Sequence, residues 1–224
     1  MAKRNRNPRR GVKEPGARRA EVSRKTRETD VRLRVDLDRA APAAVRTGVG
    51  FFDHMLIALA THGRFGLEVE ARGDLHVDQH HLVEDVGIAL GTAIREALGT
   101  DLRIRRFAHA YAPLDDALAL AVVDVSGRGY LHFDARFRRA RVGGFEVDLA
   151  AEFFAALAAN ARINLHLAVV HGRNAHHQLE ALFKALALAL RDALARDGSL
   201  WAVPSTKGAL SEAQARGLAR RSRR

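Results

Sequence analysis

Two short stretches of this chain carry the same arrangement of side chains that bind metal ions. A His-His-x-x-Glu run occurs at His80–Glu84 and again at His176–Glu180, so the same interval separates the two histidine pairs and the two glutamates. Residues three or four positions apart share one face of a helix, which places each glutamate beside the histidines of its own run. Imidazole and carboxylate groups bind Mn, Fe, Co, Ni and Zn. The two runs therefore predict a metal-dependent enzyme.

Each histidine doublet indicates more than one metal ion. Adjacent residues on a helix point roughly 100° apart, so a single ion rarely binds both histidines of one doublet. The pattern thus favours two ions, each of which takes one histidine from a given helix. One doublet could arise by chance, whereas chance does not explain two doublets with matched glutamates. The chain has no cysteine, which excludes a thiolate metal site and a disulfide-stabilised scaffold.

Other histidines and several basic residues could complete such a site. His54 lies on an expected helix, and His166 interrupts an otherwise apolar strand. Lone histidines such as His109 and His132 are more often ordinary surface or core residues, and the sequence leaves the role of His62 open.

Basic residues beside turns and metal motifs favour an anionic substrate. Lys207 follows a polar run at 204–206, whose hydroxyl and backbone N–H groups can hold an anion together with the lysine. Next to a metal site, Arg106, Arg128 and Lys184 favour a phosphorylated small molecule.

The region between the two ends of the chain is predicted to be a duplication. Alternating residues at 31–37 predict a half-buried strand, and the apolar run at 117–125 predicts a more buried one. In each half we expect a further short strand, a helix that opens with a Phe pair (Phe51-Phe52 and Phe153-Phe154), another strand and the helix with the doublet. The last strand and helix are expected at 66–71 and 81–98, and at 163–170 and 176–195. The predicted fold class is α+β, with two copies of a β-β-α-β-α unit.

The net charge of +11 is concentrated at the two ends. Residues 1–27 carry +9 and residues 216–224 carry +5, whereas residues 28–215 carry −3. Runs of like charge are typical of disordered segments, so we expect neither tail to be needed for catalysis and nucleic acid to bind them only nonspecifically. We expect a disordered extension at 1–20, a first repeat at 21–107, a second repeat at 108–200, a phosphate-binding segment at 201–215 and a basic tail at 216–224.

The sequence predicts a cytoplasmic protein outside the membrane. No apolar run reaches the roughly 18 residues that span a bilayer, and no apolar segment follows the basic N-terminus as in a secretory signal. A non-enzymatic RNA-binding protein is the alternative that the basic tails leave open, but the near-neutral middle of the chain argues against it.

Several motifs, in order and at matching spacing over residues 20–208, resemble those of the imidazoleglycerol-phosphate dehydratase family. They are Gly48–Leu56, Asp78–Asp85, Ala112–Ala117, Ser126–Arg128 and His176–Ala185, and Pro204–Gly208 stands where the family has its C-terminal phosphate loop. The resemblance implies a duplicated sandwich of the ribosomal-protein-S5-domain-2-like type and a homo-oligomer of 24 subunits. It also implies two Mn²⁺ ions per active site, formed where subunits meet, with other divalent transition metals as alternatives.

The resemblance also assigns individual residues. The implied metal ligands are His54, His80, His81, Glu84, His166, His176, His177 and Glu180. The implied substrate contacts are Glu28, His62, Arg106, Arg128, Ser205 and Lys207, and the implied catalytic residues are Glu28, Glu180 and Lys184.

The implied reaction is the dehydration of imidazole glycerol phosphate to imidazole acetol phosphate in histidine biosynthesis. It would pass through a dimetal-bound imidazolate and a diazafulvene-like intermediate, with Glu28 or Glu180 as the acid/base. Ile57 and Ala58 depart from the family's usual His-Gln, and a glutamine there could bind phosphate. A metal-dependent lyase or hydrolase for another phosphorylated azole, which would tolerate Ala58, is the second alternative.

Overall fold

The computed structural model of this chain describes residues 16–100, 102–200 and 204–205. Residues 1–15, the basic tail at 216–224, and Lys207 with most of the expected phosphate-binding segment lie outside the described residues. Every other candidate site residue is described.

The first half of the chain forms a four-stranded sheet with two helices. Its strands are β1 (Arg19–Lys25), β2 (Thr29–Asp36), β3 (Ala44–Arg46) and β4 (Gly66–Gly73), and its helices are α1 (Gly50–Gly63) and α2 (His80–Leu98). The strand order is β1-β2-β4-β3. Strand β2 runs antiparallel to β1 and β4, and β3 runs parallel to β4.

The second half repeats this plan. Its strands are β5 (Phe107–Leu114), β6 (Ala117–Asp124), β7 (Tyr130–Asp134) and β10 (Asn164–His171), and its helices are α3 (Leu149–Ala161) and α4 (Ala175–Ala193). The sheet order β5-β6-β10-β7 has the same pattern of antiparallel and parallel neighbours. A small hairpin, β8 (Arg141–Val142) and β9 (Phe145–Glu146), is inserted before α3. The predicted α+β duplication is confirmed.

Each half contains one strand that the sequence did not predict. Strands β1 and β5 each lie at the edge of a sheet. None of the β1 residues is fully buried, and β5 buries only Ala112. An edge strand with so little buried surface has no clear apolar alternation, so its pattern reads as a charged or irregular segment. The repeated unit is therefore β-β-β-α-β-α, and β1 begins just before the boundary expected at residue 21.

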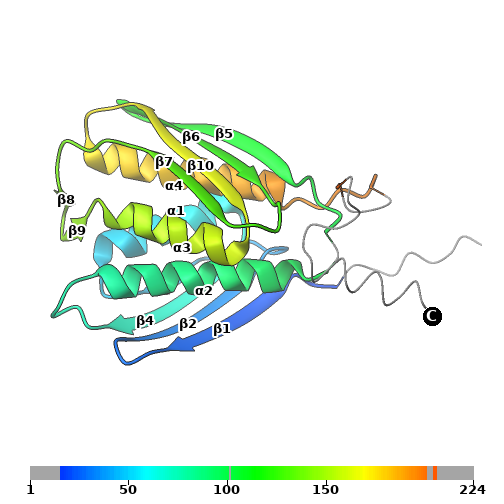
Figure 1. The fold of residues 1–224 in the computed structure, drawn as a ribbon, viewed down its shortest axis with the longest axis horizontal. Helices are drawn as coiled ribbons and strands as arrows, with labels where there is room; N and C mark the ends of the chain where they lie inside the picture. Colours follow the sequence, from blue (N-terminus) through cyan, green and yellow to red (C-terminus); the bar gives the residue numbers. More distant parts are fainter. Residues whose placement is uncertain (1–15, 101, 201–203, 206–224) are drawn as a thin grey trace, which may run out of the picture.

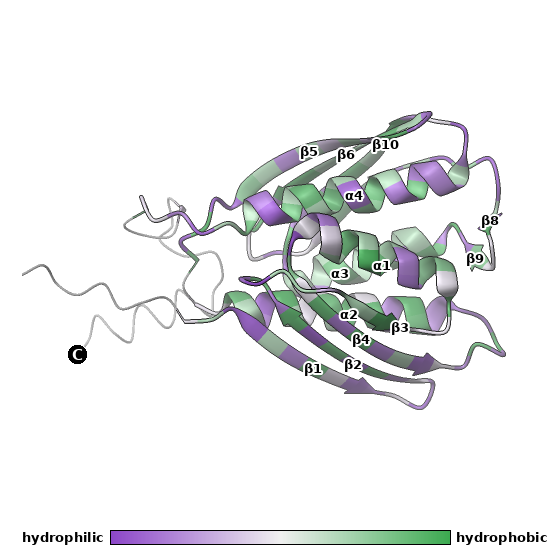
Figure 2. Cartoon of the chain, turned by 180° about the vertical axis from the view of Figure 1, so that it is seen from behind, coloured by the Kyte–Doolittle hydropathy of each residue, from purple (hydrophilic) through white to green (hydrophobic). Residues whose placement is uncertain are grey.

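The helices lie between the two sheets and share one apolar core. Figure 1 shows α2 against the first sheet and α4 against the second, with α1 and α3 between them. Helix α1 packs against α4, and α3 packs against α2, so the main contacts between the halves are helical. Figure 2 shows hydrophilic and hydrophobic residues alternating along the strands of the first sheet, as expected for strands with one buried face. Val31, Leu33 and Val35 illustrate this alternation, because they are buried while Arg32 and Arg34 are exposed.

The two halves can be matched residue by residue. The buried positions of α1 are 52, 55, 56, 58, 59, 60 and 63, and those of α3 after Leu149 are 150, 153, 154, 156, 157, 158 and 161. Both helices end before an arginine in the left-handed region, Arg64 (φ 56°) and Arg162 (φ 55°). The two Phe pairs at the expected helix starts are therefore not equivalent, and Glu152 holds the position in α3 that His54 holds in α1.

The doublets fall on the first turns of their helices because polar side chains fix the helix starts. The backbone N–H of His80 donates to Asp78 Oδ1 (2.8 Å), and that of His176 donates to Asn174 Oδ1 (3.0 Å). Such contacts satisfy N–H groups that lack a partner within the helix. Among the described helices, none is long and apolar enough to cross a membrane.

Arg18, which the sequence placed in the disordered extension, is fixed to both halves of the molecule. Its guanidinium forms an ion pair with Asp38 (2.7 Å) and donates to the backbone oxygen of Leu194. Burial raises the pKa of Asp38, but hydrogen bonds from Arg18 and Arg196 outweigh this effect and lower it to about 2. Asp38 is therefore ionised at neutral pH and depends on Arg18 for part of its compensation.

We expect deletion of residues 1–20 to destabilise the fold, whereas deletion of residues 1–15 leaves its stability unchanged. The longer deletion removes Arg18 and the first residues of β1 and leaves Asp38 with less compensation, which costs on the order of 2–4 kcal/mol. Thermal unfolding should then shift down by roughly 5–10 °C. Arg18→Met should reproduce most of this shift. The matched control is Arg19→Met, because the Arg19–Asp36 ion pair is exposed on the arginine side. Equal midpoints for both deletions would contradict the assignment.

Candidate active site

The second doublet meets a histidine from the other half of the chain. His54 of α1 and His176 of α4 place their Nε2 atoms 3.2 Å and 3.1 Å from the same oxygen, Oε2 of Glu180. One ligand atom from each of the three residues lies within 4.8 Å of the others. Two imidazole nitrogens and a carboxylate that converge in this way fit a divalent transition metal, because the set contains nitrogen and oxygen donors and no sulfur.

Apolar contacts between the two helices hold this group together. The ring of Phe51, one turn before His54, meets the ring of His176 edge-on at 5.1 Å between centroids. Phe51 also packs against Phe145 of the inserted hairpin, at 5.6 Å. The start of α1 is fixed by Asp53, whose Oδ1 accepts hydrogen bonds from the backbone and hydroxyl of Thr47 (2.9 and 2.6 Å). The orientation of His54 thus depends on packing that involves both halves.

Lys184 and His62 lie beside the same group. Lys184 is one turn beyond Glu180 on α4, and its Nζ lies 2.8 Å from Glu180 Oε1. Burial raises the pKa of Glu180, but hydrogen bonds from Lys184, His54 and His176 together lower it to about 2. Burial and the nearby charge of Lys184 lower the pKa of His62. Glu180 is therefore a carboxylate at neutral pH, surrounded by donors, which suits a metal ligand better than a proton donor.

His177, the other member of this doublet, is held by the β5–β6 turn. Asp116 places Oδ1 2.7 Å from His177 Nδ1, and its Oδ2 accepts the backbone N–H groups of Arg173 (2.7 Å) and Asn174 (3.2 Å). Hydrogen bonds from His177 and from these two N–H groups lower the pKa of Asp116 to about 2. A carboxylate on one ring nitrogen orients a histidine whose other nitrogen binds metal. The sequence did not predict this contact of Asp116.

The first doublet also has carboxylates beside its second histidine, but they make fewer contacts than those at the second doublet. His81 Nδ1 lies 3.0 Å from Asp74 Oδ2 and 3.7 Å from Glu28 Oε2 of the β1–β2 turn. The hydrogen bond with Asp74 raises the pKa of His81 and lowers that of Asp74. The second oxygen of Asp74 is buried without a hydrogen-bond partner. The sequence missed Asp74, although a carboxylate in the loop before a histidine doublet is a usable signal.

His80 and Glu84 do not form a three-ligand group with another residue of the described chain. The rings of His80 and His81 are nearly perpendicular, at 88°, as expected for neighbours on a helix. The group of His54, His176 and Glu180 has no counterpart of its kind among residues 16–100 and 102–200. At the position equivalent to His54, α3 carries Glu152, so the duplication is not chemically symmetric here.

His166 lies on the outer face of the second sheet. Its neighbours Leu165 and Leu167 are buried under α4, so His166 points to the opposite side of β10. There its ring faces those of His132 (5.5 Å) and Tyr130 (5.7 Å). Within one chain the sheet therefore separates His166 from the other candidate ligands.

The candidate phosphate contacts lie at the far end of the sheet. Arg106 precedes β5 and binds Asp124 at the end of β6 through Nε (2.8 Å) and Nη2 (3.3 Å), while Nη1 donates to the backbone oxygen of Pro204 (2.6 Å). Arg128 is exposed in the next turn, and Ser205 follows Pro204. The turn that holds His177 is at the other end of β5, roughly 25 Å away for a strand of this length. Figure 1 shows β5 running along the second sheet, so one chain does not bring the two ends of this strand together.

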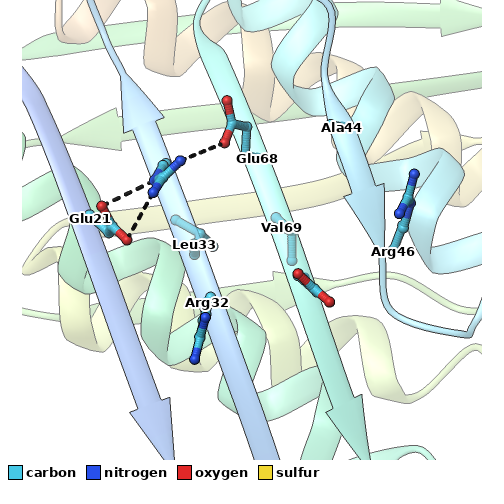
Figure 3. A pocket seen from close by; sticks show the side chains of 9 residues that line it. Glu21, Arg32, Leu33, Ala44, Arg46, Glu68 and Val69 are labelled. Carbon is cyan, nitrogen blue, oxygen red and sulfur yellow. Dashed lines mark hydrogen bonds and ion pairs between the residues drawn. The ribbon is translucent and has the colours of Figure 1, made fainter.

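Two further features bear on the candidate site. Ala58 is 7% exposed on the inner side of α1, so its predicted effect on phosphate binding concerns a buried position. The hollow in Figure 3 lies on the outer face of the first sheet, where Arg34 pairs with Glu21 (3.0 Å) and Glu68 (3.4 Å). It contains no histidine, and its charges compensate each other, so it is not a metal site.

The comparisons with known proteins agree with one another. Residues 47–190 match the family model described as imidazoleglycerol-phosphate dehydratase. The chain is 52% identical over 193 residues to the enzyme of that name from Streptococcus sanguinis, covering 86% of this chain and all of the relative. It is 57% identical over 190 residues to that from Symbiobacterium thermophilum, covering 85% of this chain and 91% of the relative.

Solved structures of the same kind superpose on the fold. The imidazoleglycerol-phosphate dehydratase of Staphylococcus aureus matches with a TM-score of 0.73 and 37% identity, over 80% of this chain and 99% of that one. The Pyrococcus furiosus structure matches with a TM-score of 0.72 and 37% identity, over 84% and 99%.

We expect His54→Ala and His176→Ala each to weaken the binding of a divalent transition metal by at least about 100-fold, because each removes a direct donor. His109→Ala is the matched control, since His109 is exposed on the outer face of β5. Metal titration followed by equilibrium dialysis measures the change. Unaltered affinity in the His54 variant would show that the convergence on Glu180 is not a metal site.

Proposed function

The chain belongs to the imidazoleglycerol-phosphate dehydratase family, hydro-lyases of histidine biosynthesis, and we propose that its active site holds two Mn²⁺ ions and dehydrates imidazole glycerol phosphate to imidazole acetol phosphate. Family membership removes the alternative of a non-enzymatic RNA-binding protein. The observation that carries the proposal is the convergence of His54 and His176 on Glu180. Metal ions bound by these residues and by the first doublet supply positive charge that favours the anionic form of the substrate's imidazole ring.

The structure favours different roles for the two candidate carboxylates. Glu180 accepts hydrogen bonds from Lys184 and two histidines and has a pKa of about 2, so it is a weak base and serves as a ligand. The side chain of Glu28 is 55% exposed and reaches only to 3.7 Å from His81 Nδ1. A carboxylate with free oxygens can accept a proton from substrate. Glu28 therefore accepts the carbon-bound proton and returns it to the departing hydroxide, so that water leaves, the carboxylate is regenerated and the resulting enol becomes the ketone.

Lys184 keeps Glu180 ionised and oriented rather than reacting itself. Its ammonium group is 2.8 Å from Glu180 Oε1 and its side chain is 20% exposed. Asp116 and Asp74 hold the Nδ1 sides of His177 and His81, respectively. These contacts fix the ring orientations before the metal binds, which lowers the cost of organising the site.

The separation of the two ends supports a site shared between chains. Arg106, Arg128 and Ser205 lie one strand length from His177, which a small phosphorylated molecule cannot span. We therefore assign the phosphate contacts, with Lys207, to a neighbouring subunit. His166, on the outer face of its sheet, reaches a metal only in another chain. An assembly of 24 subunits, as the family resemblance implies, satisfies both requirements.

We expect the purified chain to release water from imidazole glycerol phosphate, with activity lost on chelation and regained on addition of Mn²⁺. His80→Ala and His176→Ala should lower turnover by at least about 1000-fold, since each opens a metal's ligand shell. His109→Ala should retain normal turnover. Elemental analysis should give close to two ions per chain. Absence of dehydration with Mn²⁺ present, together with intact folding, would reject this function and favour a different phosphorylated azole.

We expect a particle far larger than a monomer. Light scattering at increasing Mn²⁺ should show assembly, because no single chain contains both the histidines and the phosphate contacts at one place. The particle should dissociate, or fail to form, after metal removal. A stable monomer with full activity would contradict the shared site.

A further inference from the structure

Asp85 is a buried carboxylate next to the first metal-binding run, on a different side of the helix from Glu84. Its side chain is only 7% exposed. Oδ1 accepts a hydrogen bond from Arg24 Nε (2.8 Å), and Oδ2 accepts one from the hydroxyl of Thr29. Arg24 belongs to β1 and Thr29 begins β2. One carboxylate of α2 therefore binds both strands of the first hairpin close to their turn.

The contact continues through hydroxyl groups to the backbone of Glu28. Because the Thr29 hydroxyl donates its only proton to Asp85, the Thr26 hydroxyl must donate to Thr29 Oγ1, 3.1 Å away. Thr26 Oγ1 in turn accepts the backbone N–H groups of Glu28 (3.1 Å) and Thr29 (2.9 Å). The hydrogen bond to Asp85 thus fixes the direction of the bond between the two threonine hydroxyls, and this chain of contacts ends at the backbone N–H of Glu28.

The second half of the molecule packs the equivalent hairpin on its helix without such a network. The β1–β2 and β5–β6 registers are equivalent, since Arg24 pairs with Val31 as Ala112 pairs with Ala119. At the positions of Arg24, Thr29 and Asp85, the second half has the buried alanines Ala112, Ala117 and Ala181. Three small apolar residues therefore fill these positions without a buried charge. A polar network in the first half, which carries the cost of burying a charge, calls for a reason beyond packing.

The two turns differ in how their carboxylates are held. Glu28 and Asp116 occupy the same place, directly before β2 and β6, and both face the second histidine of a doublet. Asp116 is fixed directly, because its own oxygen accepts two backbone N–H groups of the β10–α4 loop. Among the described residues, the Glu28 carboxylate accepts no backbone N–H group and pairs only with His81, so its place depends on the backbone of its turn.

We propose that Asp85 is a positioning residue for Glu28, holding the β1–β2 turn on helix α2 so that the Glu28 carboxylate stays beside His81; this inference rests on the role of Glu28 proposed above. Arg24 supplies the opposite charge beside the buried Asp85 carboxylate. The Glu28 side chain remains exposed enough to contact a substrate, while the hydrogen bonds among Asp85, Thr29 and Thr26 hold the backbone of the turn.

Hydrogen exchange of the metal-loaded protein tests the contact without any substrate. In Asp85→Asn the amide group cannot accept from both Arg24 and Thr29, so the hydroxyl chain loses its direction. Exchange at the Glu28 and Thr29 amides should accelerate by about tenfold. Asp30→Asn is the matched control, because Asp30 forms the exposed Lys25 ion pair across the same two strands. Unchanged exchange in Asp85→Asn would overturn the proposal.

A double-mutant cycle tests whether Asp85 acts through Glu28. Asp85→Asn should lower kcat by about tenfold in the native background and by less than about threefold when combined with Glu28→Gln. KM and bound metal should change little, and Asp30→Asn should keep kcat within about twofold. Equal loss in both backgrounds, or loss of metal, would show that Asp85 acts through the fold or through Glu84 and overturn the proposal. An inactive native chain would instead reject the proposed function, while the exchange result still decides whether Asp85 holds the turn.

Discussion

The contact between Glu180 and two histidines depends on one packing arrangement, that of α1 against α4. His54 and Glu180 are 126 residues apart in the chain and meet only because the apolar face of a first-half helix packs on a second-half helix. Phe51, packed between His176 and the β8–β9 hairpin, fixes the spacing. The same apolar contacts that hold the two halves together therefore also set the distances between the candidate metal-binding atoms, and neither half can supply this group by itself.

The two halves share one geometry. In each, the turn between the first two strands lies over the start of the helix that carries the histidine doublet. The two copies then fix that turn by different means. The second half uses backbone N–H groups on Asp116 itself, and the first uses Asp85, Thr29 and Thr26 beneath Glu28. A carboxylate saturated by donors, as Asp116 is, orients a histidine but has little capacity left for substrate. In the role proposed for Glu28 that capacity is kept, because the network holds the backbone of its turn rather than its carboxylate oxygens.

The length of a β-strand separates the candidate histidines from the candidate phosphate contacts within one chain. Strand β5 has the histidine-holding turn at one end and Arg106 at the other. A rigid sheet cannot shorten this separation, and for this reason the proposed function joins phosphate and metal across a boundary between chains. Arg106 is paired with Asp124 and with the backbone oxygen of Pro204, which places Pro204 beside the start of β5. The sheet thus fixes the position of the histidine-holding turn at one end of β5 and that of Arg106 at the other.

The sequence by itself determined the features that follow from local periodicity. The two runs at His80–Glu84 and His176–Glu180, the helices that carry them and the duplicated α+β plan were all predicted, because helix faces and apolar alternation depend on near neighbours. The edge strands β1 and β5 were missed, since strands with little buried surface leave no periodic signal. Only the tertiary structure decided that His54 joins Glu180, that Asp74 and Asp116 hold His81 and His177, and that Arg106 faces Asp124. A pattern shows which face of an element is apolar, but which faces meet is decided by the packing of the whole chain.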